Sequence, residues 1–346
     1  MKEPLARRAV RTAPPFRPHP LLAGFHRQTL VASLCHGPTP GGRREERVIR
    51  LDARNAVVAA CHWQARREAP LLLLLHGLTG SADSAYMLRT ARKAFAAGFH
   101  VVRLNARNCG DTEELCATLY HGGLHEDPLL VARQLVERDG VTHLHVAGFS
   151  LGGNLVLRLA ASFGDHPPPW LAGVSTVSAS LDLAECAENM DGTPSLAHYR
   201  RMYLDGIRRM LRRRAALEPA RRDLSGLDHV TTFRELDERF TAPEFGFAGA
   251  EDYYARSSSL SLLRRVDVPA LLIHSLDDEF VPGGSHERAA REAPETMAVL
   301  LARAGGHCGF VGAGPAHEDG VPDRDRYWAE NRLVRFAART CGLQAG

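Results

Sequence analysis

This chain contains, in this order, a serine, an aspartate and a histidine that could together perform acyl transfer. The serine, Ser150, lies in the G-x-S-x-G pattern of residues 148–152. A serine hydroxyl is a weak nucleophile until a histidine accepts its proton, and a carboxylate must orient that histidine. The pattern therefore predicts attack on a carbonyl group by Ser150, and the matching acid and base are to be sought farther along the chain.

Two adjacent carboxylates, Asp277 and Asp278, follow the apolar run 271–274, at the expected end of a strand. Asp278 is the preferred acid, because it lies three residues before Val281, the spacing common in hydrolases. Asp277 would then accept hydrogen bonds from the backbone of its own loop. Asp182, which follows the preceding strand, is a weaker alternative.

The preferred base is His307, in the glycine-rich loop 304–310 that follows the apolar run 297–301. The resulting order, Ser150, Asp278, His307, is the triad order of α/β hydrolases. His317 is a poor substitute, because it lies farther from the strand and among acids. Cys308 has neither an elbow nor a partner that would support a thiol mechanism.

Two backbone N–H groups are expected to form an oxyanion hole. One belongs to Leu151, which follows the nucleophile at the positive end of a helix. The other is assigned to Leu78, with Gly77 as an alternative, because the apolar run 71–75 leads directly into a glycine turn. His76 is expected to support this turn rather than to take part in catalysis.

The sequence gives no sign of a cofactor or a metal site. His121 and His125 have the spacing of helical metal ligands, but the glycines between them disfavour a helix, and no third ligand is apparent. Neither a P-loop nor a dinucleotide-binding glycine pattern is present. We therefore expect a cofactor-free reaction.

The elements that must position these residues follow from the hydrophobic pattern. Two alternating segments, 48–51 and 57–63, predict a hairpin. After it, strands and helices alternate, which predicts an α/β fold with a mostly parallel central sheet flanked by helices. The expected strands are 70–75, 100–104, 144–147, 171–177, 269–273 and 297–301, and the expected helices are 84–97, 126–138, 151–162, 284–291 and 325–339.

This alternation stops between Leu181 and about Arg264. We expect an N-terminal arm over residues 1–44, a catalytic core formed by 45–180 and 265–346, and a mainly helical cap inserted over 181–264. Residues 181–264 are called the cap segment below. The candidates for the wall of a substrate pocket in the cap segment are Phe233, Phe240, Phe245 and Phe247.

Composition excludes several classes of protein. The 346 residues are 45% hydrophobic and 24% charged with a net charge of +3, which argues against disorder and against a dedicated nucleic-acid binder. The strongest apolar run, 70–75, is far shorter than a membrane helix. Seven cysteines without a C-x-x-C pair and an N-terminus without a signal-peptide core favour a cytoplasmic location.

An arginine-rich stretch lies within the cap segment. A solvated helix face is the ordinary interpretation, and contact with anionic lipid headgroups at a membrane surface, or with an acidic substrate, is the alternative. The stretch comprises Arg200, Arg201, Arg208, Arg209, Arg212, Arg213, Arg214, Arg221 and Arg222.

Several blocks of sequence resemble those of the YheT-like branch of the α/β-hydrolase superfamily. They are GFHRQTL (24–30), HGLTGS (76–81), NARNCGDTEEL (105–115), YHGGLHED (120–127), GFSLGGN (148–154), DYYARSS (252–258), LLIHSLDDEFVP (271–282) and GGHCGF (305–310). The resemblance implies a cofactor-free serine esterase with its triad at Ser150, Asp278 and His307. Asn108 and Thr79 depart from the family pattern, which usually has glycine at these places.

The expected activity is hydrolysis of short- to medium-chain acyl esters through an acyl-enzyme intermediate, with a small-molecule ester or lipid as substrate. The family that the chain resembles includes phospholipases and enzymes that make or hydrolyse medium-chain fatty-acyl esters. Phospholipase or acyltransferase activity is therefore the first alternative. A non-catalytic lipid-binding protein of the same fold is the second. The sequence does not assign an oligomeric state.

Overall fold

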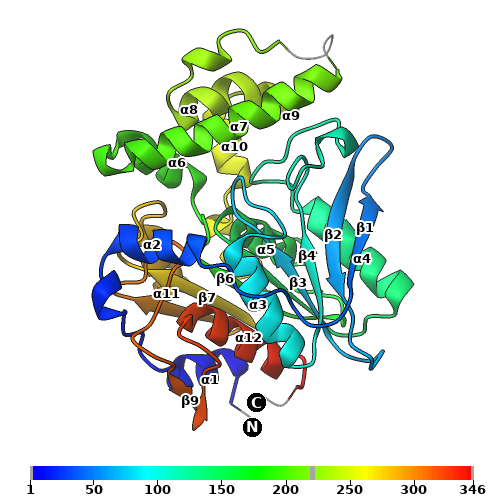
Figure 1. Ribbon diagram of the computed structural model, residues 1–346, viewed down its shortest axis with the longest axis vertical. Coiled ribbons are helices and arrows are strands. Elements are labelled where there is room, and N and C mark those ends of the chain that lie inside the picture. Colours follow the sequence, from blue (N-terminus) through cyan, green and yellow to red (C-terminus); the bar gives the residue numbers. More distant parts are fainter. Residues whose placement is uncertain (1–2, 219–222, 344–346) are drawn as a thin grey trace.

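The computed structural model describes residues 3–218 and 223–343, which build an eight-stranded sheet in the order β1-β2-β4-β3-β5-β6-β7-β8 (Figure 1). β2 pairs antiparallel with β1 and with β4, and every other neighbouring pair is parallel. The predicted α/β class with a mostly parallel sheet is confirmed. The strands are β1 (Arg44–Arg50), β2 (Ala56–His62), β3 (Leu71–Leu75), β4 (His100–Leu104), β5 (Leu144–Phe149), β6 (Leu171–Val177), β7 (Ala270–Ser275) and β8 (Met297–Ala302).

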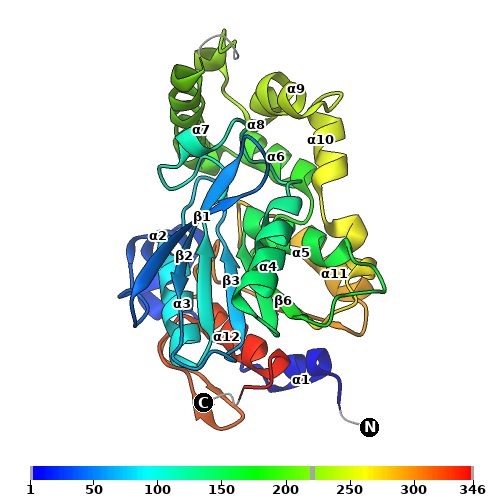
Figure 2. The ribbon, with the colours of Figure 1, turned by 90° about the vertical axis from the view of Figure 1, so that its right-hand side faces the viewer.

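Helices cover both faces of the sheet (Figure 2). In β3, Leu71, Leu73 and Leu75 belong to one core and Leu72 and Leu74 to the other, because successive side chains point to opposite faces. The first core includes α4 (Glu126–Asp139), α5 (Leu151–Ala161) and α11 (Gly283–Glu292); the second includes α1 (Leu5–Thr12), α3 (Ala85–Ala96) and α12 (Trp328–Thr340).

β1 begins at Arg44, four residues before the predicted strand. The added residues are charged and lie on the edge of the sheet, where side chains remain in solvent. Arg47 binds Glu45 of the same strand and Asp139 at the end of α4. Charged edge strands lack the apolar alternation by which a strand is recognised in sequence.

The regular elements in the described part of the cap segment are all helical, and they form a layer beyond one end of the sheet (Figure 1). Its apolar side chains join a third hydrophobic cluster, which also includes Leu119, Leu151 and Phe280 from outside the segment. The elements are α6 (Leu183–Gly192), η3 (Pro194–Leu196), α7 (Ala197–Leu217), η5 (Leu227–His229), α8 (Phe233–Leu236), η6 (Asp237–Thr241, a π-helix), α9 (Ala242–Phe245), α10 (Ala250–Ser257) and η7 (Leu260–Arg265).

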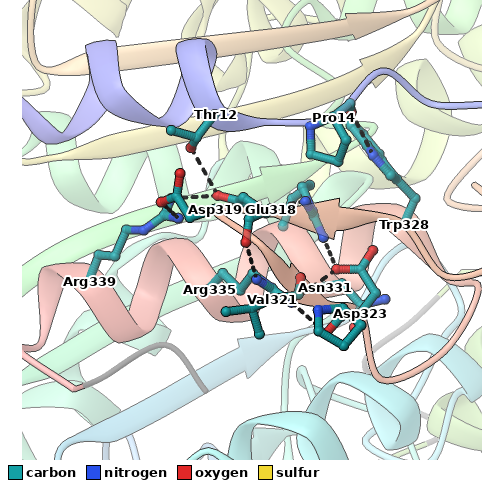
Figure 3. A network of polar contacts seen from close by, with 12 residues as sticks. Thr12, Pro14, Glu318, Asp319, Val321, Asp323, Trp328, Asn331, Arg335 and Arg339 are labelled. Carbon is teal, nitrogen blue, oxygen red and sulfur yellow. Dashed lines mark hydrogen bonds and ion pairs between the residues drawn. The ribbon is translucent and has the colours of Figure 1, made fainter.

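The N-terminal residues pack against the core rather than extend from it. Besides α1 they form η1 (Pro20–Leu22) and α2 (Phe25–Leu34), and α2 contacts α3. A small hairpin, β9 (His317–Glu318) and β10 (Val321–Pro322), is fixed between α1 and α12 by polar contacts: Glu318 accepts from Thr12 and binds Arg339 (Figure 3). The N-terminal segment and the loop after His307 are thereby held to the same helix.

None of the helices within the described ranges combines the length and the apolar character that crossing a membrane requires.

One short connecting helix, η2 (Glu113–Leu115), completes the described elements of the core.

Candidate active site

Ser150 lies on a sharp turn between β5 and α5. Its backbone angles, φ 52° and ψ −122°, are strained for a residue with a side chain. The flanking glycines leave room for this turn: a Cβ on Gly148 would lie 2.3 Å from the Gly152 carbonyl oxygen, and one on Gly152 would lie 2.4 Å from the His76 carbonyl oxygen. The predicted strand-to-helix elbow is thus present, with Ser150 at the carboxyl edge of the sheet.

Asp278 and His307 lie in contact, although 29 residues separate them in the sequence. The Asp278 side chain is buried, and its Oδ1 accepts hydrogen bonds from the backbone N–H groups of Phe280 (3.0 Å) and Val281 (3.1 Å). Its Oδ2 lies 2.8 Å from His307 Nδ1. This contact places the proton on Nδ1 and leaves Nε2 able to accept another.

The electrostatics of this pair follow from its burial. Burial opposes the charged form of each group, but the attraction between the carboxylate and the imidazolium outweighs it. The pKa of Asp278 is lowered, and that of His307 is raised well above its usual value. The pair therefore stabilises a proton on the imidazole, which is what a base must hold after it deprotonates a nucleophile.

Asp277 has a different role from its neighbour. Its Oδ1 accepts hydrogen bonds from Ser275 Oγ and from the backbone N–H of Gly306 (2.9 Å), the residue before His307. The two carboxylates therefore have different contacts: Asp278 binds the imidazole, and Asp277 binds the backbone of the loop that carries it. The sequence could not separate them with certainty, since both follow the same strand.

Ser150 and His307 line one cavity of about 150 Å³. The contacts among the described residues include no hydrogen bond between them, and in such sites this bond often tightens only when substrate binds. The remaining lining is mostly apolar, from the cap segment and the carboxyl edge of the sheet, and includes Leu119, Leu183, Met190, Tyr203, Ile207, Met210, Phe233 and Leu236.

Some backbone N–H groups beside Ser150 are bonded within the protein, and others have no acceptor among the described residues. The Gly77 N–H donates to Tyr86 Oη (3.0 Å), and the Thr79 N–H donates to Tyr120 Oη (2.6 Å). The N–H groups of Leu78 and Leu151 donate to no acceptor among the described residues. Both leucines line the cavity, as the predicted oxyanion hole requires.

Helix α2 holds the loop of His307, a role that the sequence did not reveal. Thr29 Oγ1 accepts a hydrogen bond from the His307 N–H (2.9 Å) and donates one to the Phe25 carbonyl (2.8 Å). Gln28 exchanges two side-chain hydrogen bonds with the backbone of Val311, at 3.0 and 2.7 Å.

Two glycines of that loop allow this close approach of α2. A Cβ on Gly306 would lie 2.8 Å from Thr29 Oγ1, and one on Gly309 would lie 2.7 Å from the Gln28 carbonyl oxygen. The block GFHRQTL resembled a family motif, but spacing alone gave no reason to connect it with a histidine almost 280 residues away.

The alternatives weighed from the sequence have other surroundings. Asp182 accepts from the Glu185 N–H as the N-cap of α6. His76 bonds the Gly77 carbonyl and the Ala106 N–H, and burial lowers its pKa to about 4, so it supports two loops as expected. His121 packs against Phe245 and Phe247, and burial lowers its pKa to about 3.

Cys308 and the candidate phenylalanines are placed as follows. Cys308 is buried, and its N–H donates to Ser178 Oγ.

Of the four phenylalanines proposed for the pocket wall, Phe233 is the one that lines the cavity among the described residues. Phe245 and Phe247 pack against His121, which itself lines the cavity, and Phe240 lies beside Arg239.

Thr79 and Asn108, the departures from the family pattern, both have left-handed backbones, with φ of 55° and 59°. Glycine adopts this conformation without strain, and asparagine tolerates it. A β-branched threonine does so at a cost of about 1–2 kcal/mol. Glycine, which the family resemblance implies at these two positions, would adopt this geometry without strain.

The arginines of α7 are mostly engaged by neighbours. Arg221 and Arg222 lie outside the described residues. The described contacts are Arg200 with the Met190 and Asp191 carbonyls, Arg201 and Arg208 with Asp205, Arg212 with Asp228, Arg213 with Asp111 and Glu113, and the buried Arg214 with Glu218. Arg209 makes no such contact with the described residues. Much of the positive charge that the sequence concentrates here is therefore balanced locally.

The sheet, the elbow and the position of the acid and histidine after later strands define an α/β hydrolase. A model of the alpha/beta hydrolase fold family matches residues 70–313. The chain is 31% identical over 268 residues to "Putative esterase YheT" of Escherichia coli (strain K12), covering 76% of this chain and 75% of that protein. The chain belongs to the α/β-hydrolase family, in its YheT-like esterase branch.

Two further similarities agree with this membership. Human "Phospholipase ABHD3" is 25% identical over 291 residues, which cover 82% of this chain and 70% of that protein. The crystal structure of the alpha/beta hydrolase GrgF from Penicillium sp. sh18 matches 87% of this chain and all of that chain, with a TM-score of 0.58 at 15% identity. The chain is thus an esterase- or lipase-type α/β hydrolase.

Proposed function

We propose that this protein hydrolyses carboxylic acyl esters through Ser150, His307 and Asp278. The observation that carries the proposal is that Ser150 and His307 line one largely apolar cavity, and that Asp278 binds the His307 imidazole from outside the lining. An acyl chain is the part of an ester that such a lining would bind, and the three side chains supply the nucleophile, the base and its orienting acid.

The proposed reaction has two halves. Ser150 Oγ attacks the ester carbonyl while His307 Nε2 accepts its proton, and the Leu78 and Leu151 N–H groups bind the oxyanion that forms. The protonated imidazole then gives its proton to the departing alcohol. Water, deprotonated by His307, attacks the acyl-enzyme and releases the carboxylic acid.

We propose that residues 181–264 act as a cap over a core formed by 45–180 and 265–346, with 1–44 as an N-terminal arm packed against that core. The cap segment supplies much of the apolar lining, including Met190, Ile207 and Phe233. Substrate selection would therefore depend on the cap, while the chemistry depends on the core.

A series of 4-nitrophenyl esters of increasing chain length tests this proposal. Each methylene buried in the cavity contributes about 0.8 kcal/mol, so kcat/KM should rise about fourfold per methylene until the cavity is full. Initial rates for the acetyl to the dodecanoyl ester measure this rise. Absence of turnover with every ester would contradict the proposal.

Phospholipase or acyltransferase activity is a second candidate, favoured by the apolar lining and by the similarity to a protein named as a phospholipase. Two arms added to the ester series decide between these activities. Release of fatty acid from a short-chain phosphatidylcholine would indicate a phospholipase, and formation of a new ester on addition of an alcohol would indicate transfer.

The activity should decline with falling pH through the raised pKa of His307. The imidazole acts as a base only when it is neutral, and the Asp278 carboxylate favours its protonated form. The decline of kcat/KM should therefore lie above pH 6.5, higher than an unperturbed histidine would give. Rates measured from pH 9 to 5, with Ser150→Ala as the blank at each pH, check this, and a flat profile would count against His307.

Replacing Thr29 with valine should lower kcat/KM about tenfold to a hundredfold. Valine keeps the shape of threonine but removes the hydroxyl that accepts from the His307 N–H, and small displacements of a catalytic group have effects of this size. Thr29→Ser keeps the hydroxyl and should remain close to the wild type. Equal rates in the two variants, at similar Tm, would show that this bond does not position His307.

A further inference from the structure

The cavity that holds Ser150 and His307 contains one carboxylate among its described lining residues, that of Asp237. Asp237 opens the π-helix Asp237–Thr241, which lies between α8 and α9. π-helical turns are rare, and they occur frequently at functional sites. A carboxylate in a mostly apolar lining is costly to place there, so its presence suggests a role in binding.

The carboxylate is held in place by two donors. Asp237 Oδ1 accepts from Thr241 Oγ1 (2.7 Å), and Oδ2 accepts from Tyr254 Oη (2.8 Å). A carboxylate has about four acceptor positions, so these bonds leave capacity on both oxygens. No basic side chain among the described residues forms an ion pair with Asp237. What the group can still do is accept hydrogen bonds.

The position of Asp237 relative to the elbow is fixed through α10. Tyr254 binds the carboxylate, and its neighbour Tyr253 accepts a hydrogen bond from the Gly122 N–H (3.0 Å). The Gly122 carbonyl in turn accepts from Asn154 Nδ2 (2.7 Å), on the helix that begins beside Ser150. A continuous set of contacts therefore holds this acceptor in the cavity where the ester would react.

The ionisation of the Asp237 carboxyl group suits a group that accepts hydrogen bonds from uncharged donors. Burial raises the pKa of Asp237 to about 6, with the bonds from Thr241 and Tyr254 opposing the rise. Near neutral pH the group is mostly ionised. The surrounding lining, which includes Ile207, Met210 and Leu236, suits an uncharged chain rather than a cationic one.

We propose that Asp237, oriented by Thr241 and Tyr254, binds a hydroxyl group carried by the ester substrate. This inference rests on the proposed esterase function and narrows its substrate class to hydroxylated acyl esters. The hydroxyl can belong to the alcohol, as in a partial glyceride, or to the acyl chain. Asp237 is here a specificity-determining residue and takes no part in bond cleavage.

Two matched pairs of substrates test the proposal and separate these sources. The alcohol pair is 1-monooctanoylglycerol and propyl octanoate, which differ by two hydroxyls. The acyl pair is the 4-nitrophenyl ester of 8-hydroxyoctanoate and that of octanoate. The wild type should prefer the hydroxylated member of at least one pair by about tenfold to a hundredfold in kcat/KM, as hydrogen bonds to charged groups allow.

Removing the acceptor should remove this preference. Asp237→Leu combined with Tyr254→Phe replaces both partners by apolar groups, which avoids an unsatisfied hydroxyl, and Thr241 can bond a carbonyl of its own helix. The preference ratio should fall to about one. Asp237→Asn, which keeps the shape but loses the charge, should lower it at least threefold and serves if the double variant does not fold.

The outcomes separate the two proposals. Wild-type protein that hydrolyses the plain esters without preferring either hydroxylated partner, or a preference unchanged in the Asp237 variants, would overturn the hydroxyl site and leave the esterase proposal standing. Failure of the wild type to hydrolyse any of the four esters, or hydrolysis that persists in Ser150→Ala, would overturn the esterase proposal itself.

Discussion

Replacing Ser150 with alanine should lower kcat for ester hydrolysis by a factor of about 10³ or more while the fold stays intact. The side chain lies at the strained elbow between β5 and α5, in the cavity with His307, and alanine removes the hydroxyl that the proposed acyl-enzyme requires. Initial rates with a 4-nitrophenyl ester measure the loss, and circular dichroism and Tm report on the fold.

Ser180 offers the matched control, because it is a second serine in the lining of the same cavity and its N–H donates to the Ser150 carbonyl. Ser180→Ala should keep activity within about tenfold of the wild type. Activity in Ser150→Ala comparable to that of Ser180→Ala would rule out Ser150 as the nucleophile.

Asn substitutions at the two adjacent aspartates should have very different effects. Asp278→Asn should reduce kcat about 10⁴-fold, because an amide no longer fixes the histidine tautomer with its proton on Nδ1. Asp277→Asn keeps an amide oxygen that can accept from the Gly306 N–H, and should lose about tenfold or less.

Kinetics of the two variants at several pH values complete this comparison. Asp278→Asn should also lower the pKa of His307, since the Asp278 charge is the largest of the causes that raise it. If Asp277→Asn were instead the more damaging change, the assignment of the acid to Asp278 would be wrong.

The sequence carried enough information to predict the core of this fold, because the buried strands are short continuous apolar runs between amphipathic helices. The five leucines of β3, which serve both faces of the sheet, are the clearest case. The elbow at Ser150 was also predictable, since tight turns restrict which residues can flank them. Edge strand β1 was found only in part, because its residues 44–47 are charged.

Contacts between distant segments could not be read in the same way. Nothing in the spacing of Gln28 and Thr29 indicates that they support the loop of His307, because that bond depends on how α2 packs against a glycine-rich loop. The cap segment shows the same limit. Its helical character followed from the break in alternation, but which of its phenylalanines faces the cavity depends on helix orientations.

The central claim is that Ser150 is the nucleophile of this site, and covalent labelling tests it most directly. After reaction with a fluorophosphonate, tryptic digestion should give a modified peptide spanning residues 139–158, in which Ser150 is the one serine. A single adduct on this peptide, absent from Ser150→Ala, is the predicted result. A wild-type protein that stays unlabelled, or an adduct on another peptide that persists in Ser150→Ala, would contradict the claim.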